Sequence, residues 1–386
     1  MTSLRGIAAA VVGTGFIGVV HVDALRRLGV DVVGVVGSTP QRAREKARVA
    51  PLPEPYESFE AMLADDRVRV VHLASPNHLH AEQAHAALRA GKHVVCEKPL
   101  ANTAAETAAL LAAARASGLV HATNFNQRFW PQVIEARARV RAGEIGAVRL
   151  VSGGYLQDWL VRDSDWNWRL DPARGGALRA VGDIGSHWVD LASHVTGLPV
   201  RAVMADLATF VTVRREPTGP VETFGGGGGA AGEAVDREMA SEDAAGLMLR
   251  RGDSARAVCV LSQVSPGRKN LLHFEVDGSE AALAWAAERH EELWIGHRGR
   301  PNELLLRDPS LGAGGGPTAM PAGHAEGFAD TFRDLYRAVY ADVAAGGPSD
   351  DPAYPTFAAG HEQAVIGEAI ARSAAEGRWA DVGRPA

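Results

Sequence analysis

A short apolar stretch followed by a glycine-rich turn places the strongest constraint on how this chain folds. Residues Ile7 to Val12 are continuously apolar, and the sequence Gly13-Thr14-Gly15-Phe16-Ile17-Gly18 follows at once. A helical pattern then runs to about Leu28, and a second apolar stretch covers Val30 to Val36. A strand, a glycine turn, a helix and a strand within roughly 30 residues form the pattern of a βαβ unit that binds a dinucleotide. The alternative is a turn whose glycines serve only tight packing.

Each glycine of this turn has a separate physical task in the dinucleotide interpretation. Gly13 permits the tight turn, Gly15 lets a pyrophosphate approach the backbone, and Gly18 lets the helix pack closely on the strand. The first turn of the helix, which includes Phe16 and Ile17, presents free N–H groups and the positive end of its dipole to a phosphate. We therefore predict that these five residues bind the cofactor.

The end of the second predicted strand bears on the choice between NAD and NADP. An acidic residue there would bind the ribose 2′-hydroxyl of NAD, but the chain continues Gly37-Ser38-Thr39-Pro40-Gln41-Arg42. No carboxylate repels a 2′-phosphate, and Ser38 and Arg42 offer it a hydroxyl and a guanidinium. This favours NADP slightly over NAD. Alternatively, Ser38 and Thr39 cap a helix that starts near Pro40, Arg42 is solvated, and NAD binds without the acid.

Two more apolar stretches, Val68 to Ser75 and Lys92 to Cys96, predict buried parallel strands. Functional loops of such sheets follow the carboxyl ends of the strands. A lysine at this edge, Lys98, can be partly desolvated, with its pKa lowered from about 10.4; the alternative is a solvated edge residue. The predicted cofactor-binding residues after these strands are Ser75, Pro76, Asn77, His80, Glu97 and Lys98. A last strand near Leu119 to Asn124 ends a first domain, which we place at residues 1–124.

From Phe125 onward the regular alternation of strands and helices stops. The apolar segments at residues 148–153, 200–213, 244–249, 255–264 and 271–276 indicate strands with hairpin-like connections. We therefore predict an α/β protein in which a doubly wound parallel sheet precedes an antiparallel-type α+β domain at residues 125–386. The glycine run from Gly225 to Gly229 is expected to be a flexible connection between two of these strands.

The stretch from Val181 to Asp190 places Asp183 and His187 four residues apart. In a helix this spacing stacks both side chains on one face. A carboxylate beside an imidazole holds the tautomer of the ring and tunes its pKa for proton transfer near neutral pH. The alternative is a solvated pair or a carboxylate that only stabilises the start of the helix. His194 is a rival base, because it continues the same helical face.

Aromatic and polar side chains alternate shortly before this stretch. Trp159, Trp166 and Trp168 lie among polar residues that include Asp158 and Arg169. Indole faces stack on the C–H faces of sugars, while carboxylate, amide and guanidinium groups bind hydroxyls. The cluster therefore predicts a pocket for a polyhydroxylated ligand, with an oligomer contact or a small satellite core as the alternative.

Composition narrows the classes of partner. The formal net charge of −6 argues against nucleic acid and anionic membrane surfaces. No apolar run approaches the roughly 20 residues that a membrane helix needs, and the two cysteines, Cys96 and Cys259, read as buried free thiols. His78 and His80 form an H-x-H pair, but no thiolate set accompanies them, so no metal is predicted. We expect a soluble cytoplasmic protein.

Four motifs in order make the chain resemble the Gfo/Idh/MocA family of sugar and cyclitol dehydrogenases. They are Gly13 to Gly18, Ser75-Pro76-Asn77-His78-Leu79-His80, Gly91 to Leu100 and Gly182-Asp183-Ile184-Gly185-Ser186-His187. The resemblance covers essentially the full length. It implies a Rossmann domain followed by an α+β domain with a large, open, mostly antiparallel sheet that makes homodimer or homotetramer contacts. It also implies substrate between the domains and a cis peptide before Pro99.

The resemblance also implies that Lys98, Asp183 and His187 lie at the nicotinamide. His187 then acts as the general base, Asp183 orients His187 or the substrate, and Lys98 polarises the reacting hydroxyl. The remaining predicted substrate residues are Asn126, Arg128, Tyr155, Asp158, Trp159, Trp168 and Arg169.

Three functions are compatible with these residues. The first is an NAD(P)-dependent dehydrogenase of a secondary alcohol on a sugar, anhydrosugar or cyclitol. The second is a glycosidase that keeps its NAD and cleaves by transient oxidation and elimination. The third is a dinucleotide-binding sensor without catalysis. The joint presence of Lys98, Asp183 and His187 disfavours the sensor, which would not need all three.

Overall fold

The computed structural model describes residues 4–219, 234–310, 312 and 319–383 of the 386-residue chain. The predicted glycine connection from Gly225 to Gly229 lies outside the described residues. Two compact units form. One comprises the chain up to Asn126 and Phe328–Ala364, and the other comprises Gln127–Gly327 and residues 365–383. The predicted domains, 1–124 and 125–386, nearly share the first boundary but lack the return of residues 328–364 to the first unit.

The first unit is built on a five-stranded sheet with the order β2-β1-β3-β4-β5, in which every pair is parallel. Its strands are β1 (Ala8–Val12), β2 (Asp31–Val36), β3 (Val68–Leu73), β4 (His93–Cys96) and β5 (His121–Thr123). Its helices are α1 (Phe16–Arg27), α2 (Pro40–Val49), α3 (Phe59–Leu63), α4 (Asn77–Arg89), α5 (Ala104–Ser117) and α9 (Phe328–Ala345). The order doubles back beside β1, as expected of a doubly wound sheet. This confirms the predicted Rossmann fold.

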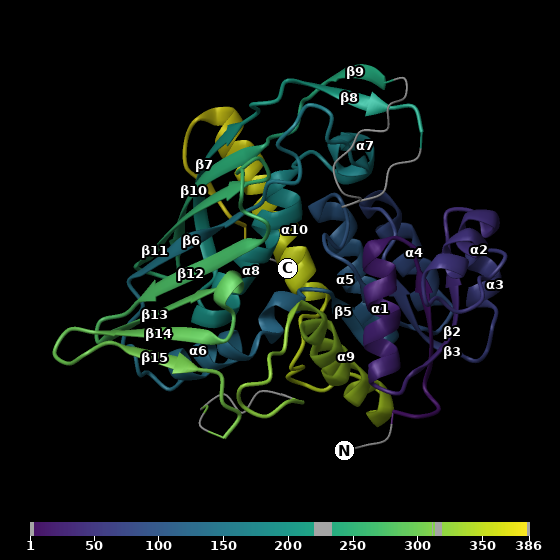
Figure 1. Ribbon diagram of the computed structural model, residues 1–386, viewed down its shortest axis with the longest axis horizontal. Helices are drawn as coiled ribbons and strands as arrows, with labels where there is room; N and C mark the ends of the chain where they lie inside the picture. The colour runs from purple at the N-terminus through teal and green to yellow at the C-terminus, as the bar shows by residue number, and fades with distance from the viewer. Residues whose placement is uncertain (1–3, 220–233, 311, 313–318, 384–386) are drawn as a thin grey trace. The chain divides into compact units, whose positions relative to one another are not determined.

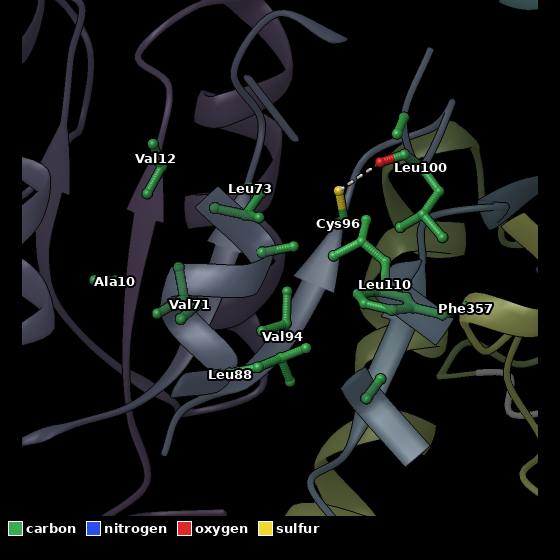
Figure 2. Close-up of a cluster of buried hydrophobic side chains, with 14 of the residues drawn as sticks. Ala10, Val12, Val71, Leu73, Leu88, Val94, Cys96, Leu100, Leu110 and Phe357 are labelled. Atoms are coloured by element: carbon green, nitrogen blue, oxygen red, sulfur yellow. Dashed lines mark hydrogen bonds between the residues drawn. The ribbon is translucent and has the colours of Figure 1, made fainter. Parts of the chain in front are cut away.

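The core of the first unit lies between this sheet and the helices that connect its strands. Figure 2 shows Val12, Val71 and Val94 projecting from β1, β3 and β4 toward apolar residues of the helices. Leu88 of α4 and Leu110 of α5 cover them on this side of the sheet. Because strands of a parallel sheet are buried on both faces, they are apolar throughout, which is why their sequences could be recognised.

Helix α9 joins the first unit although it follows most of the second unit in sequence. Figure 1 shows α9 beside α1. Its buried apolar residues recur at helical spacing and include Phe332, Tyr336 and Tyr340. The His21 ring of α1 lies 5.9 Å from the Phe332 ring and 5.3 Å from the Tyr336 ring, measured between centroids. The Rossmann unit is therefore completed by a distant part of the chain.

The second unit contains a nine-stranded sheet with the order β15-β14-β13-β12-β6-β11-β10-β7-β16. Only the β6–β11 pair is parallel, so the predicted large, mostly antiparallel sheet is confirmed. Its strands are β6 (Leu150–Leu156), β7 (Val200–Ala208), β10 (Ala244–Arg251), β11 (Ala255–Ser262), β12 (Leu271–Asp277), β13 (Ala281–Ala286), β14 (Glu292–His297), β15 (Glu303–Leu306) and β16 (Ala380–Asp381). A separate ribbon pairs β8 (Val213–Pro217) with β9 (Ala234–Glu238).

Helices cover one face of this sheet, as Figure 1 shows for α6 and α8. The helical elements are α6 (Pro131–Arg141), α7 (Pro172–Gly175), α8 (Ser186–Thr196), α10 (Phe357–Glu376) and the short turns η1 (Asn126–Phe129), η2 (Trp168–Leu170), η3 (Val181–Gly185) and η4 (Ala287–Arg289). Two of them cross the boundary between the units, because residues 357–364 of α10 and Asn126 of η1 belong to the first unit. Trp188 of α8 is fully buried, and its indole N–H donates to the carbonyl of His273 at 2.9 Å. Buried and exposed residues alternate along most of β10 and β11, so the opposite face of these strands is exposed.

The predicted strand at residues 200–213 is wrong as a single strand. β7 ends at Ala208, and β8 begins at Val213. The reason is a buried carboxylate: Asp243 Oδ2 accepts hydrogen bonds from the N–H groups of Phe210 and Val211 at 2.7 and 2.8 Å. These two donors therefore leave the sheet ladder.

None of the helices formed by the described residues is both long enough and apolar enough to cross a lipid bilayer.

Candidate active site

The glycine turn between β1 and α1 has the geometry that a dinucleotide requires. Gly13 adopts a φ of +116°, and a Cβ there would lie 2.3 Å from the Ala74 carbonyl oxygen. A Cβ at Gly18 would lie 2.0 Å from the Gly13 carbonyl oxygen. A Cβ at Gly15, in contrast, would meet nothing within 4 Å. The packing of the protein therefore requires glycine at positions 13 and 18, whereas the space beside Gly15 is open to a ligand.

The start of α1 is prepared for an anion. Gly15 precedes the helix, no side chain of the described residues caps it, and its first turn carries no acidic residue. Phe16 is 48% exposed. The amino-terminal end of α1, with the positive end of the helix dipole, therefore lies beside the open position at Gly15, which fits a pyrophosphate.

The packing at the end of β2 explains why no acidic residue stands at Gly37. A Cβ at Gly37 would lie 2.8 Å from the Cβ of Ala43 on α2, so a larger side chain would displace that helix. Thr39 caps α2 by accepting the N–H of Arg42 at 3.2 Å, as the capping alternative predicted. Ser38 and the Arg42 side chain are exposed. Capping and 2′-phosphate binding are therefore compatible, because different groups carry them out.

The loop after β3 is joined to the loop after β4 by one histidine. The buried His80 ring has Nε2 at 2.8 Å from the Ser75 carbonyl and Nδ1 at 2.8 Å from the Pro99 carbonyl. Burial lowers the pKa of His80, and a neutral ring donates to one of these carbonyls only. Ser75 donates to Gln83 at 2.6 Å, and Asn77 is buried at the start of α4. The predicted cofactor contacts of Ser75, Pro76, Asn77 and His80 stay predictions; for His80, the ring nitrogens hold the two loops.

Glu97 and Lys98 follow β4, and the peptide bond from Lys98 to Pro99 is cis, as the resemblance implied. Glu97 is buried and accepts from the His21 ring at 3.1 Å, from the Asn124 amide, and from the Lys98 N–H at 3.2 Å. Burial raises the pKa of Glu97, but the hydrogen bond and charge of His21 and the charge of Lys98 outweigh it, so the net shift is downward. The Lys98 side chain is half-buried. A carboxylate therefore fixes the backbone that carries the predicted catalytic lysine.

A buried polar chain that the sequence did not reveal continues inward from Glu97. His21 Nδ1 lies 3.0 Å from His72 Nδ1, and His72 Nε2 lies 3.0 Å from the Tyr340 hydroxyl. Burial lowers the pKa of His72 well below its ordinary value. A neutral His72 ring has one donating and one accepting nitrogen, so it joins the His21 ring to the Tyr340 hydroxyl.

In the second unit, Asp183 lies on a π-helical turn, Val181–Gly185, that opens into α8. Its Oδ2 accepts from the Gln263 amide at 2.8 Å, and its Oδ1 lies 3.2 Å from Arg169 Nε. Both carboxylate oxygens therefore face donors, which stabilises the ionised form. The π turn also interrupts the α-helical spacing on which the predicted common face of Asp183 and His194 depended.

His187 lies in the first turn of α8 and is buried, with 7% of its surface exposed. Its ring centroid lies 6.3 Å from that of Tyr155, whose hydroxyl donates to Asn270 at 2.6 Å. Burial, and then the negative charge of Asp183, raise the pKa of Tyr155 well above its ordinary value. The structure therefore brings the His187 and Tyr155 rings together and places Tyr155 near the charge of Asp183.

The aromatic cluster is ordered by neighbouring polar groups. The Arg169 guanidinium lies 4.4 Å above the Trp168 ring while it pairs with Asp183. The Trp159 indole N–H donates to Gln157 Oε1 at 2.9 Å. Asp158 differs, because Lys269 binds it at 2.6 Å and lowers its pKa. Its predicted contact with substrate therefore competes with an ion pair on the surface.

Three other residues have partners away from this cluster. Asn126 donates to Thr331 at 2.8 Å within the first unit. Arg128 forms a two-pronged ion pair with Asp190, with 2.8 Å between Nε and Oδ2. Arg137 contacts both ring nitrogens of His194 at 3.0 and 3.1 Å. Substrate contacts by Asn126 and Arg128 stay predictions. The pKa of His194 is lowered by burial, then by the charge of Arg128, and then by the charge of Arg137.

Gln263, Asn270 and Gln157 were missed by the sequence reasoning. Gln263 and Gln157 each follow an apolar strand, β11 and β6, and Gln157 shares Asn270 Oδ1 with the Tyr155 hydroxyl. The signal available was a polar residue directly after a buried strand. That signal does not name the partner, because the two members of each pair are far apart in sequence.

Comparison with known proteins relates both units of the chain to one protein family. The family model described as "Oxidoreductase family, NAD-binding Rossmann fold" matches residues 7–125, and the "GFO/IDH/MocA C-terminal domain" matches residues 133–284. The levoglucosan dehydrogenase of Pseudarthrobacter phenanthrenivorans is 31% identical over 410 aligned positions, which cover 98% of this chain and 99% of that protein.

Two solved structures cover the chain equally well. One is a levoglucosan dehydrogenase in complex with NADH and levoglucosan, 28% identical, with a TM-score of 0.87 over 98% of this chain and 100% of that one. The other is an inositol dehydrogenase homologue from Azotobacter vinelandii in complex with NAD⁺, 26% identical, with a TM-score of 0.85 over 98% and 97%.

The fold and the glycine turn define an oxidoreductase with an NAD-binding Rossmann fold. The chain belongs to the Gfo/Idh/MocA family.

Proposed function

We propose that the protein is an NAD(P)-dependent dehydrogenase that transfers a hydride between a secondary alcohol of a sugar, anhydrosugar or cyclitol and the nicotinamide. One observation carries this proposal. The same chain combines a glycine turn that fits a pyrophosphate with a partly buried carboxylate, Asp183, and a buried imidazole, His187, bordered by Tyr155 and the Trp168–Arg169 stack. Aromatic faces beside hydrogen-bonding groups suit a polyhydroxylated ligand.

The proposed roles follow from the chemistry of each group. His187 takes the hydroxyl proton as general base, since a neutral imidazole has a ring nitrogen that can accept a proton. Asp183 stays ionised between Gln263 and Arg169 and orients His187 or the substrate. Lys98 polarises the reacting hydroxyl and stabilises developing negative charge on its oxygen. The nicotinamide, when bound, accepts the hydride.

We propose an anhydrosugar as the first substrate to test. The similarity to levoglucosan dehydrogenase, which extends over 98% of the chain, supports this choice. The segment Gly323 to Phe328 and the stretch around Tyr155 also resemble family members that act on pyranosides, anhydrosugars or inositols.

The test is a spectrophotometric assay at 340 nm with NAD and NADP separately, against levoglucosan, pyranoses, inositols and aryl glycosides. Absorbance that grows with one sugar and one cofactor supports the dehydrogenase. Release of aglycone without absorbance growth would instead show the glycosidase reaction. Binding of dinucleotide without absorbance growth or aglycone release from any compound of the panel would favour the sensor.

Lys98→Ala tests the role of the lysine. We expect kcat to fall by roughly 10²–10⁴-fold, because the alanine can no longer polarise the hydroxyl. NADH affinity, measured by fluorescence titration, should change little, because the glycine turn is untouched. Wild-type turnover in this variant would exclude Lys98 from the chemistry.

We also propose a preference for NADP over NAD, supported by Ser38 and Arg42, which are exposed at the end of β2, and by the absence of an acid at Gly37. The exposed guanidinium offers a 2′-phosphate a positive charge. NAD remains a cofactor in this proposal, with the weaker affinity.

We propose further that the protein is a cytoplasmic homodimer or homotetramer that associates through the open face of the large sheet. Met248 and Val258 oppose each other across β10 and β11, and with Val260 they are 44–55% exposed. An exposed apolar patch of this kind favours a protein interface. The thiols of Cys96 and Cys259 are free and buried, which suits a reducing compartment. Sedimentation velocity should show an oligomer that Val260→Asp dissociates; a wild-type monomer would contradict this.

A further inference from the structure

The π-helical turn that carries Asp183 begins against a buried carboxylate from a distant segment. Glu242, with 4% of its surface exposed, accepts the Val181 N–H at 2.8 Å and the Arg179 N–H at 3.1 Å. The first N–H groups of a helix need such acceptors, and they are usually supplied by a residue next to the helix. Here the acceptor is supplied from the segment that leads into β10, so the turn is fixed relative to the sheet.

The next residue, Asp243, anchors that segment. Its fully buried carboxylate pairs with the guanidinium groups of Arg179 and Arg214, with 2.8 Å to Arg214. It also accepts the two backbone N–H groups that end β7. Two acidic and two basic side chains therefore balance in charge, and the Arg214 guanidinium is held further by the Leu160 carbonyl at 2.9 Å. A network of buried, hydrogen-bonded charges resists displacement of any one member.

Gln263 connects this anchor to the predicted catalytic residue. Its backbone N–H donates to the Asp243 carbonyl at 3.0 Å, and its side-chain amide donates to Asp183 Oδ2 at 2.8 Å. Gln263 is fully buried. The same short segment therefore holds the backbone of the π turn and, through Gln263, the carboxylate on it.

The carbonyl oxygen of the Gln263 side-chain amide lowers the stability of the folded protein. Within the described part of the chain, the buried Oε1 of Gln263 has no hydrogen-bond partner. A buried carbonyl oxygen that loses water without gaining a donor destabilises the folded state. An apolar side chain of similar size would remove this cost, so stability alone does not explain a glutamine at this position.

We propose that Gln263 is a positioning residue for the reaction: it fixes the rotamer and the ionised state of Asp183, and stability is given up for that task. The proposal rests on the proposed function, because it requires that Asp183 act in the chemistry. Arg169 approaches the other oxygen of Asp183 at 3.2 Å but belongs to the partly exposed Trp168 stack. Gln263 is the buried one of these two contacts.

Gln263→Met tests the proposal, because methionine conserves approximate volume and flexibility but removes the donor and the unpartnered oxygen. We expect kcat to fall roughly 10–100-fold, the range for loss of a hydrogen bond to a charged group. KM for the dinucleotide should stay unchanged. The melting temperature should stay level or rise, whereas a purely structural glutamine would lower it.

The chain offers a matched control in Gln132. This glutamine is also buried in the second unit, and its amide donates to the carbonyls of Glu291 and Leu305 at 3.0 and 2.7 Å. Gln132→Met should lower the melting temperature and leave kcat within about threefold of wild type, because carbonyl partners are lost but Asp183 is not.

A double-mutant cycle with Asp183→Asn decides whether Gln263 acts through Asp183. We expect Gln263→Met to lower kcat by less than about threefold once Asp183→Asn is present. Independent, multiplying losses would overturn the proposal, as would a Gln263→Met enzyme with wild-type kcat. If Gln263→Met fails to fold, Gln263→Asn, which shortens the reach to Asp183, takes its place in the same cycle.

Failure of the proposed function has a different signature. A wild-type enzyme that oxidises no member of the sugar panel, or an Asp183→Asn enzyme with full activity, removes the role of Asp183 and with it the task of Gln263. An active wild type, an impaired Asp183→Asn and multiplying losses leave the function standing and reject Gln263 alone.

Discussion

Whereas the first unit prepares its ligand site with backbone, the second unit prepares its site with side chains from distant elements. The turn from Gly13 to Gly18 is shaped by contacts inside a single βαβ unit and with Ala74, which follows the neighbouring strand β3. Asp183, in contrast, is held by Gln263 and Arg169, and Gln263 lies 80 residues away in sequence.

The difference has a physical consequence. A backbone site depends on the space that side chains leave free, so only substitutions that add atoms to the glycines damage it. A site of side chains depends on matched donors and acceptors, so the loss of one partner leaves another group unsatisfied. The following predictions test this contrast, beginning with the largest effect.

The strongest test in the second unit compares two histidines of α8. His187→Ala should lower the rate of sugar oxidation by about 10²–10⁴-fold, or roughly 3–5 kcal/mol of transition-state stabilisation, because a general base is lost. His194→Ala should retain most activity, since Arg137 already occupies both ring nitrogens of His194. Steady-state rates at 340 nm across pH 6 to 10 measure both. The opposite ranking would transfer the role of base to His194.

In the first unit, two glycines of the same turn should respond in different ways. Gly18→Ala puts a Cβ 2.0 Å from the Gly13 carbonyl oxygen and should destabilise the unit by about 3 kcal/mol. Gly15→Ala meets no protein atom within 4 Å, so it should keep its stability but weaken dinucleotide binding. Urea unfolding and NADH titration separate the two effects. Equal stability losses would show that the turn, rather than the ligand, demands Gly15.

Acid should weaken the first unit through His121, whose Nδ1 accepts the Phe357 N–H at 3.2 Å. Burial and then Arg115 lower the pKa of His121 from 6.5 to about 4. The unfolded chain therefore binds a proton below pH 6.5 that the folded chain refuses. The stability that the neutral His121 ring gives the folded state is therefore complete above pH 6.5 and is lost as the pH falls toward 4.

His121→Asn keeps an acceptor for the Phe357 N–H and removes the titration. Between pH 7.5 and pH 5 the variant should therefore lose about 2 kcal/mol less stability than wild type in denaturant unfolding. An identical pH dependence in the two proteins would show that His121 does not resist protonation in the fold.

The smallest effect concerns the choice of cofactor. Arg42→Ala should weaken NADP by about tenfold, or roughly 1.4 kcal/mol, and change NAD little, because one exposed charge–phosphate contact is lost. Dissociation constants for both dinucleotides, measured at low and high salt, check this. Equal weakening of both would remove the basis for an NADP preference.

The contrast between the units also explains which features could be predicted from sequence. The strand before Gly13, the glycines and the helix after them are neighbours in the chain, so the pattern contains both the element and its partner. The alternating strands of the second unit were recognisable for the same reason, and the fold class followed from them.

The partners of the polar residues could not be predicted in the same way. The π turn at Val181 to Gly185 depends on Glu242, and the break after Ala208 depends on Asp243. Both residues lie in a segment whose sequence contains no sign of what it will contact. The return of α9 to the first unit was hidden because helical periodicity shows that a face is buried but not against which element.

That return of α9 has a consequence for the growing polypeptide. Tyr340 completes the hydrogen-bonded chain through His72 and His21, yet about 200 residues are synthesised between the two parts of the first unit. At roughly 5–20 residues per second, a ribosome takes on the order of 10–40 s to deliver α9. During that interval the face of α1 that packs against α9 in the folded protein remains exposed. The amino-terminal part emerges first but is finished late, and a fragment ending near Asn126 would expose this surface to chaperones and to other unfinished chains.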